Sequence, residues 1–408
     1  MILLLALFSP FLCLLIGLKN YQKNSSKYYV LVYILFYAFT VTFPSGEVNI
    51  DFFRRIDFFN YYASLTNFSI TDLIGTLYSN DNNHQNADFL EHIMVFFVSI
   101  ITDDYRWMVV VWGLFFGLFY VNNIWFIIEK INLRINHYNI LWFMALFLII
   151  PFWNINAFRF WAAAQIFIFG ALRFFYSGNK KYLLISCLSI FAHFSFVLTV
   201  VLLFIYSLSP KKLFLANIIF LTTFLLSNIN IHALDQIINY LPAGFQAKYI
   251  GYTSIDYLDR VNVFNNVDVN FYVKLRYNLL LVAFELMFLL IYLKYKDFLK
   301  NELNRNLFFL SFIILSFSNL VFDIKPLDRF FNIGCFFMIF IGLKFWKYLF
   351  ERNQFPKIYR FISFLLIMFI VVEIRIGFDT ISIASIIGNP ITNIFLIDSN
   401  FSLIDLFK

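Results

Sequence analysis

Charged residues are scarce in this chain of 408 amino acids: Asp, Glu, Lys and Arg make up 13% of it, whereas hydrophobic residues make up 61%. So little charge cannot coat the surface of a soluble globule of this length, which excludes that class. The apolar residues instead form about ten stretches that approach the roughly 20 residues a helix needs to cross a bilayer. The sequence therefore predicts a polytopic membrane protein.

Cysteine is also rare. The chain has three cysteines, which lie far apart in apolar stretches: Cys13, Cys187 and Cys335. No two of them have the spacing of a disulfide framework or a metal site, so we expect neither. The chain lacks the P-loop, the dinucleotide-binding glycines, the nucleophile elbow and the HExxH zinc motif. We therefore expect no cofactor and no metal, and we interpret the net charge of +7 as a signal of topology rather than of a nucleic-acid partner.

The apolar stretches are continuous in Phe, Leu and Ile and lack the ten-residue alternation of a transmembrane β-barrel. They predict an all-α polytopic integral membrane protein of about ten transmembrane helices plus short re-entrant helices. We expect a single membrane domain over residues 1–408. Residues 1–18 should form an uncleaved first helix, because no basic segment or cleavage site marks a signal peptide.

Basic connectors predict how this domain is oriented. By the positive-inside rule, the Lys- and Arg-rich connectors should all be cytoplasmic. They are residues 19–27, 129–134, 177–181, 294–305 and 351–360. Two long polar loops, residues 44–90 and 229–275, and a tail, residues 379–408, should then lie outside, together with both termini.

This orientation requires two incomplete crossings. Residues 89–101 should not cross fully, and residues 182–206 should enter and return to the same side around His193, although 25 residues could also make one long tilted span. The rival topology lets both segments cross, which gives about twelve helices but leaves basic connectors on both sides. The distribution of Lys and Arg favours ten full crossings with Arg159 near the outer face.

Two ionisable residues lie within apolar sequence, Arg159 and His193. A guanidinium is permanently charged and binds two oxygens at once, so Arg159 is a candidate clamp for a phosphate or pyrophosphate. The alternative is an interfacial Arg that reaches toward headgroups. His193 should be neutral in its apolar surroundings, so it could act as a general base, or as a hydrogen-bonding residue between helices.

The first external loop adds further candidates. Asp57 and Tyr61 are four residues apart, so they share a helical face suited to a sugar ring, with Arg54 one turn before Asp57. The alternative is an interfacial amphipathic helix. Glu91 and His92 open the short piece that follows. The adjacent pair Asp103 and Asp104 could hold a metal, although a helix cap at Tyr105 explains the pair about as well.

These features resemble the EpsG family of bacterial polysaccharide polymerases, which are Wzy-like proteins. The resemblance rests on Arg159 before a small-residue helix, on Gly178 to Lys181, and on the AHFS sequence from Ala192 to Ser195. It extends by layout to Asp57, Tyr61 and Glu91, to Arg329 in LDRFFNIG and to the turn from Gly388 to Pro390. Phe160 and Trp161 stand where family members often have Gln or Asn.

The resemblance implies a GT-C-like glycosyltransferase at the outer face of the bacterial inner membrane. Its donor and acceptor would be undecaprenyl-diphosphate-linked repeat units of O-antigen, capsule or exopolysaccharide, with a flippase and a chain-length regulator as further partners. The candidate catalytic residues are Arg159, His193, Glu91 and Asp57. The candidate substrate-binding residues are Arg54, Arg55, Tyr61, Asp328 and Arg329. The alternatives are a ligase of finished glycan and a flippase of lipid-linked glycan.

Overall fold

The computed structural model describes most of the chain. The described residues are 2–42, 50–65, 71, 89–132, 134–136, 139–208, 212–225, 246, 271–321, 327–393 and 401–407. Their secondary structure is helical, apart from one isolated antiparallel bridge between Ser382 and Ser402. They form two compact units, whose boundary passes through α11 (Phe196–Leu208) and α19 (Lys357–Gly377). The expected single domain stays a prediction.

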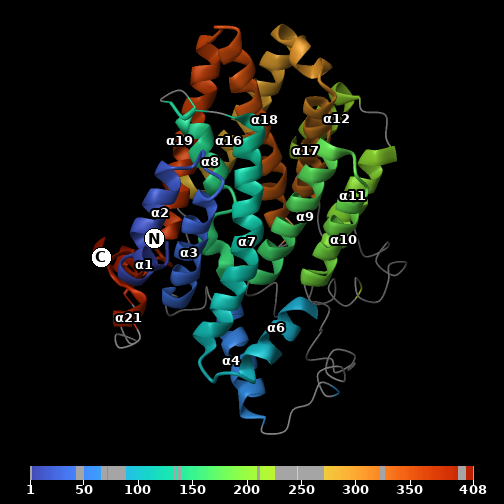
Figure 1. Ribbon diagram of the computed structural model, residues 1–408. Coiled ribbons are helices and arrows are strands. Elements are labelled where there is room, and N and C mark those ends of the chain that lie inside the picture. The colour runs from blue at the N-terminus through green and yellow to red at the C-terminus, as the bar shows by residue number, and fades with distance from the viewer. Residues whose placement is uncertain are drawn as a thin grey trace. The chain divides into compact units, whose positions relative to one another are not determined.

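Unit 1 comprises residues 1–134, 150–197 and 373–408. Its helices are α1 (Ile2–Phe8), α2 (Pro10–Lys19), α3 (Ser26–Thr40), α4 (Ile50–Ser64), α6 (Phe89–Ser99), α7 (Tyr105–Ile131), η2 (Phe152–Ala157), α9 (Phe158–Ser177), α10 (Lys181–Ala192), α20 (Ile383–Ile387), α21 (Pro390–Asn393) and η6 (Leu403–Phe407). α7 packs against α3 and α9, and α9 packs along α10. α4 and α6 lie beside the beginning of α7 (Figure 1).

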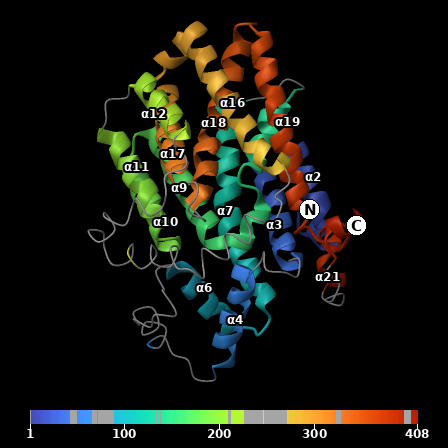
Figure 2. The same ribbon diagram turned by 180° about the vertical axis from the view of Figure 1, so that it is seen from behind.

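Unit 2 comprises residues 135–149 and 198–372. Its helices are α8 (Ile140–Leu148), α12 (Leu213–Leu225), α16 (Phe271–Lys294), η4 (Lys296–Lys300), α17 (Glu302–Leu320), η5 (Leu327–Arg329) and α18 (Phe330–Glu351), with most of α11 and α19. α17 packs against α12 and α18, as Figure 2 shows from behind. α8 meets α18 where the ring of Trp142 covers Gly342, and Trp142 Nε1 donates to Ser363 Oγ at 2.9 Å.

Five described segments are long and apolar enough to cross a membrane: Tyr105–Ile131, Ile140–Ser177, Leu275–Lys294, Glu302–Leu320 and Leu327–Glu351. The described residues are therefore helical, as predicted, and length and composition make five of their segments candidate membrane spans. Pro151 interrupts the longest of them, because proline cannot continue the hydrogen-bonding pattern of α8. The expected total of about ten crossings stays a prediction.

The two segments predicted to cross incompletely contain short helices. α6 has 11 residues, which rise about 16 Å and fall short of the hydrocarbon core. The segment around His193 is broken, since α10 ends at Ala192 and α11 begins at Phe196. The break at His193 agrees with the sequence interpretation, and the return to the same side stays a prediction.

α9 and α10 form a closely packed antiparallel pair. Gly178 ends α9 with a φ of +66°, a conformation that glycine adopts easily. A Cβ on Gly170 would lie 2.5 Å from the carbonyl oxygen of Tyr182 and 2.6 Å from the backbone nitrogen of Ser186. The close approach brings the beginning of α9 and the end of α10 to the same end of unit 1, so Arg159 and His193 lie on neighbouring helices.

Candidate functional site

The beginning of α9 is held in place by aromatic packing, and this positions Arg159. The ring of Phe158 stacks on Trp112 of α7 with centroids 5.2 Å apart, and both side chains are buried. Phe160, on the other side of Arg159 in the sequence, is also buried. Two buried neighbours fix the backbone, so the guanidinium leaves α9 in a defined direction.

Glu91 lies at the beginning of α6, which packs against α4, α7 and α10. Its side chain is only 2% exposed. Val95 and Val98 follow it at helical spacing and are buried too, so this face of α6 is turned into unit 1. A carboxylate is rarely buried without a cationic partner, and Glu91 has two.

One oxygen of Glu91 is shared by two arginines from different helices. Oε2 lies 3.2 Å from Nε of Arg159 and 3.2 Å from Nη1 of Arg55. The side chains of Arg159 and Arg55 remain 25% and 21% exposed, so both are partly accessible although they contact a buried carboxylate. We call Arg55, Glu91 and Arg159 the arginine cluster. It brings together three residues that the sequence nominated separately.

The charges of the arginine cluster favour a further anion. Within the arginine cluster, two permanently charged guanidinium groups face the same carboxylate. Arg159 also lies in the first turn of α9, at the positive end of the helix dipole. A partly exposed site of this kind is suited to bind a phosphate or diphosphate group through forked hydrogen bonds.

His193 is the C-cap of α10, and its ring contacts Phe160, the residue that follows Arg159. The rings of His193 and Phe160 lie 5.6 Å apart, edge to face, and His193 is buried. Nδ1 of His193 lies 2.9 Å from Oγ of Ser195, and the backbone N–H of Ser195 donates to Nδ1 at 3.3 Å. Ser195 therefore fixes the orientation of the ring. With a proton on Nε2, Nδ1 accepts from both the backbone N–H and the hydroxyl of Ser195, whereas with a proton on Nδ1 only the contact with the hydroxyl is a hydrogen bond.

The candidates on α4 separate by helix face. Arg55 lies on the buried face with Phe52, Phe59 and Tyr62, whereas Asp57 lies on the exposed face. Tyr61 shares the exposed face of Asp57 and is 56% exposed, as the four-residue spacing predicts. The side chain of Arg54 lies outside the described residues. Asp57 and Tyr61 are consequently turned away from Glu91.

Arg329 and Asp328 belong to unit 2, where they form η5 directly before α18. Both side chains are partly exposed. Asp323 and Lys325, which precede them in the sequence, lie outside the described residues. Sequence reasoning missed Arg276, a buried guanidinium in α16 whose Nη2 donates to Tyr277 Oη at 2.9 Å. Its signal was an Arg in an apolar helix, as at Arg159.

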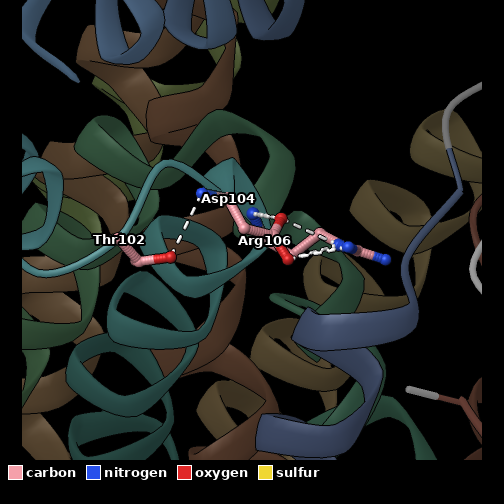
Figure 3. A network of polar contacts seen from close by, with 3 residues as sticks. All are labelled: Thr102, Asp104 and Arg106. Carbon is pink, nitrogen blue, oxygen red and sulfur yellow. Dashed lines mark hydrogen bonds and ion pairs between the residues drawn. The ribbon is translucent and has the colours of Figure 1, made fainter. Parts of the chain in front are cut away.

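Asp104 is the N-cap of α7 (Figure 3). Its Oδ1 accepts from the backbone N–H of Arg106 at 3.0 Å, and its Oδ2 accepts from Nη2 of Arg106 at 2.7 Å. The capping interpretation of Asp103 and Asp104 therefore describes the observed contacts. The described residues contain no group of three His, Cys, Asp or Glu side chains arranged to hold a metal ion.

Comparison with known proteins decides the family, because the chain matches the EpsG family over residues 27–381. The chain belongs to the EpsG family. The match includes the arginine cluster, His193 and Arg329, and excludes most of the tail. Searches of curated proteins and of solved structures found no match. Family membership and the five apolar segments together indicate a multi-pass membrane protein of polysaccharide biosynthesis.

Proposed function

We propose that this EpsG-family protein is a polysaccharide polymerase, a membrane glycosyltransferase that joins undecaprenyl-diphosphate-linked oligosaccharide repeat units. The arginine cluster is the observation that carries this proposal. A lipid-linked donor leaves as a diphosphate, whose developing negative charge must be stabilised during bond cleavage. Arg159 and Arg55 are partly exposed, permanently charged and held by one carboxylate, so they could bind that group without a metal.

In the proposed reaction, a sugar hydroxyl of the acceptor attacks the anomeric carbon of the donor glycan. The new glycosidic bond forms as the bond between that carbon and the diphosphate oxygen breaks. The bonding electrons leave with undecaprenyl diphosphate, which Arg159 and Arg55 stabilise. The hydroxyl proton goes to a general base, which must reach the reacting oxygen directly or through one water.

His193 is the base that the local geometry supports best. In the tautomer in which Nδ1–H donates to Oγ of Ser195, 2.9 Å away, the lone pair on Nε2 can accept the proton, and Nδ1 then gives up the bond from the backbone N–H of Ser195. Glu91 is less suited, because two guanidinium groups stabilise its charged form. We assign Glu91 to positioning the arginines. Asp57 and Tyr61, on the exposed face of α4, are assigned to contacts with the sugars.

The location of the reaction follows from the predicted orientation. We propose about ten crossings, a GT-C-like arrangement, and a reaction at the outer face of the bacterial inner membrane. Arg329 and Asp328, in unit 2, stay candidate substrate-binding residues. A chain-length regulator and a flippase are the expected protein partners.

The test compares surface glycan and lipid-linked glycan from the wild type, a deletion strain and Arg159→Ala. Arg106→Ala is a matched control, because Arg106 is equally exposed and also paired to a carboxylate in unit 1. In the deletion strain and in Arg159→Ala, we expect surface glycan of one repeat unit attached to the final acceptor. In Arg106→Ala, we expect the wild-type ladder of glycan lengths. Lipid-linked polymer that is not transferred would instead identify a ligase, and units trapped on the cytoplasmic leaflet a flippase. A normal ladder from Arg159→Ala, with membrane levels unchanged, would contradict the arginine assignment.

A further inference from the structure

A second group of cations lies at the other end of α9, far from the arginine cluster. Arg173 is 14 residues beyond Arg159, which corresponds to about 21 Å along the helix. Trp125 Nε1 donates to the carbonyl oxygen of Lys23 at 3.2 Å, so the connector between α2 and α3 meets the last turns of α7 here. Connectors that the sequence predicts to be cytoplasmic therefore meet at one end of unit 1.

The guanidinium of Arg173 is half-buried, and every hydrogen bond that it makes goes to a neutral oxygen. Nη1 donates to Oδ1 of Asn123 at 3.3 Å and to the carbonyl of Phe169 at 3.1 Å. Nη2 donates to the carbonyl of Asn122 at 3.2 Å. No carboxylate of the described residues lies within ion-pair distance of Arg173. Neutral oxygens hold this charge in place, and the carboxylate of Glu129 acts on it only from beyond ion-pair distance. A cation held in this way in an apolar region is costly unless an anion is supplied.

Lys27, in the first turn of α3, also contacts Asn122. Its Nζ donates to Oδ1 of Asn122 at 3.0 Å, and within the described part of the chain it makes no ion pair either. Asn122 therefore links the two cations, one through its side chain and the other through its backbone. We call Lys27 and Arg173 the inner cation pair. The nearby Lys130 adds little charge, because it pairs with the adjacent Glu129 at 3.6 Å.

Aromatic side chains cover one side of the inner cation pair. The guanidinium carbon of Arg173 lies 3.3 Å from the ring centroid of Phe169 and 4.7 Å from that of Phe126. Phe126 also packs edge to face on Tyr176, with centroids 5.2 Å apart. Half-buried aromatic rings beside cations are typical of the boundary between headgroups and acyl chains. A ligand here would meet positive charge and an apolar wall together.

We propose that the inner cation pair binds the phosphate of an anionic phospholipid in the cytoplasmic leaflet. Both cations can contact the single negative charge of one phosphodiester, and the rings of Phe126 and Phe169 match the first carbons of its acyl chains. Anionic lipids are attracted to basic groups near the cytoplasmic surface by about 1 kcal/mol per cation, which corresponds to roughly fivefold in affinity. The proposal rests on the predicted orientation and is independent of the polymerase assignment.

Native mass spectrometry of the purified full chain tests the site. The protein is titrated with phosphatidylglycerol or phosphatidylcholine of identical acyl chains. We expect tighter binding of phosphatidylglycerol, and a loss of roughly fivefold in that preference for Lys27→Gln and for Arg173→Gln. Arg173→Lys keeps the charge and should retain most of the preference.

Lys181→Gln is the matched control, because Lys181 is an exposed lysine at the same end of the α9–α10 pair. It should change the preference by less than twofold. Equal affinity for the two lipids, or an unchanged preference in Lys27→Gln, would overturn the proposal. Lys27→Gln tests the proposal even if Arg173→Gln fails to fold, because the introduced side chain can still donate a hydrogen bond to Oδ1 of Asn122. Displacement of the lipid by millimolar inorganic phosphate would identify a site for free phosphate and would overturn the lipid assignment.

Discussion

Glu91 and Arg159 lie on different helices, yet Oε2 of Glu91 is 3.2 Å from Nε of Arg159 and 3.2 Å from Nη1 of Arg55. One buried carboxylate therefore joins α4, α6 and α9 at a single point. α4 belongs to the first predicted external loop, and α9 is part of a predicted membrane span. The loop and the membrane helix are tied together where the predicted leaving group would bind.

The first prediction concerns the strength of this link. In a double-mutant cycle of Glu91→Gln and Arg159→Gln, we expect a coupling free energy of about 1–3 kcal/mol, because Glu91 is buried. The corresponding cycle of Asp104→Asn and Arg106→Gln should give less than about 1 kcal/mol, since both groups are partly exposed. Denaturant unfolding in detergent measures both. Equal coupling in the two cycles would show that Glu91 does not hold Arg159.

The residue types of the arginine cluster could be nominated from sequence, but their contacts could not. Arg159 was conspicuous as a charge in an apolar segment, and Glu91 as a carboxylate that opens a short helix. Nothing in their spacing indicated a contact, because the distance between them is set by how α6 packs on α4, α7 and α10. Arg55 was one of two adjacent arginines, and only the packing of α4 shows which of its faces is buried.

Helical periodicity predicted which residues share a helix face, but not whether that face is buried or exposed. The spacing of Asp57 and Tyr61 correctly predicted a common face, whereas the burial of Phe52, Phe59 and Tyr62 decides that this face is exposed. The short α6 and the break after Ala192 followed from segment length and charge distribution. Arg276 was missed because the polar residues before α16 had been interpreted as a loop.

The second prediction tests the shape of the cation. Arg159→Lys keeps the positive charge but loses the planar fork, so we expect the polymer yield to fall at least about tenfold while the protein stays folded. Arg55→Lys should also lower the polymer yield. Gel analysis of the surface glycan measures the yield, with membrane protein levels as the control. Full activity of both Lys variants would mean that charge alone is sufficient.

The third prediction concerns the orientation of His193. Ser195→Ala removes the hydroxyl partner of Nδ1 and leaves the backbone N–H, which favours a proton on Nε2, so we expect the polymerisation rate to fall about tenfold or more. Ser189→Ala is the matched control, because Ser189 is equally buried and donates only to a carbonyl of its own helix, at 2.6 Å. His193→Gln should be inactive yet folded. An active His193→Gln would make His193 a structural residue.

The fourth prediction separates sugar contacts from stability. Asp57 and Tyr61 are exposed, so Asp57→Asn and Tyr61→Ala should change the free energy of unfolding by less than about 0.5 kcal/mol. If they contact the repeat unit as proposed, the polymer yield should fall while the protein remains as stable as the wild type. Phe59→Ala, on the buried face of the same helix, should instead lower stability by about 3–5 kcal/mol. If both Asp57→Asn and Tyr61→Ala give the wild-type polymer yield, Asp57 and Tyr61 do not contact the repeat unit.

The fifth prediction addresses the packing that brings Arg159 and His193 to the same end of unit 1. A Cβ at Gly170 would meet backbone atoms of α10 at 2.5 and 2.6 Å, and a backbone cannot move aside as a flexible side chain can. Gly170→Ala should therefore cost about 1–3 kcal/mol and displace α10 with its terminal His193. Gly178→Ala is the control, because that position has no atom within 4 Å of the added Cβ and should cost only about 1 kcal/mol, through its positive φ. We expect Gly170→Ala to lower both the unfolding temperature and the polymer yield more than Gly178→Ala does. If the two variants are equally stable and active, close packing of α9 on α10 is not what positions His193.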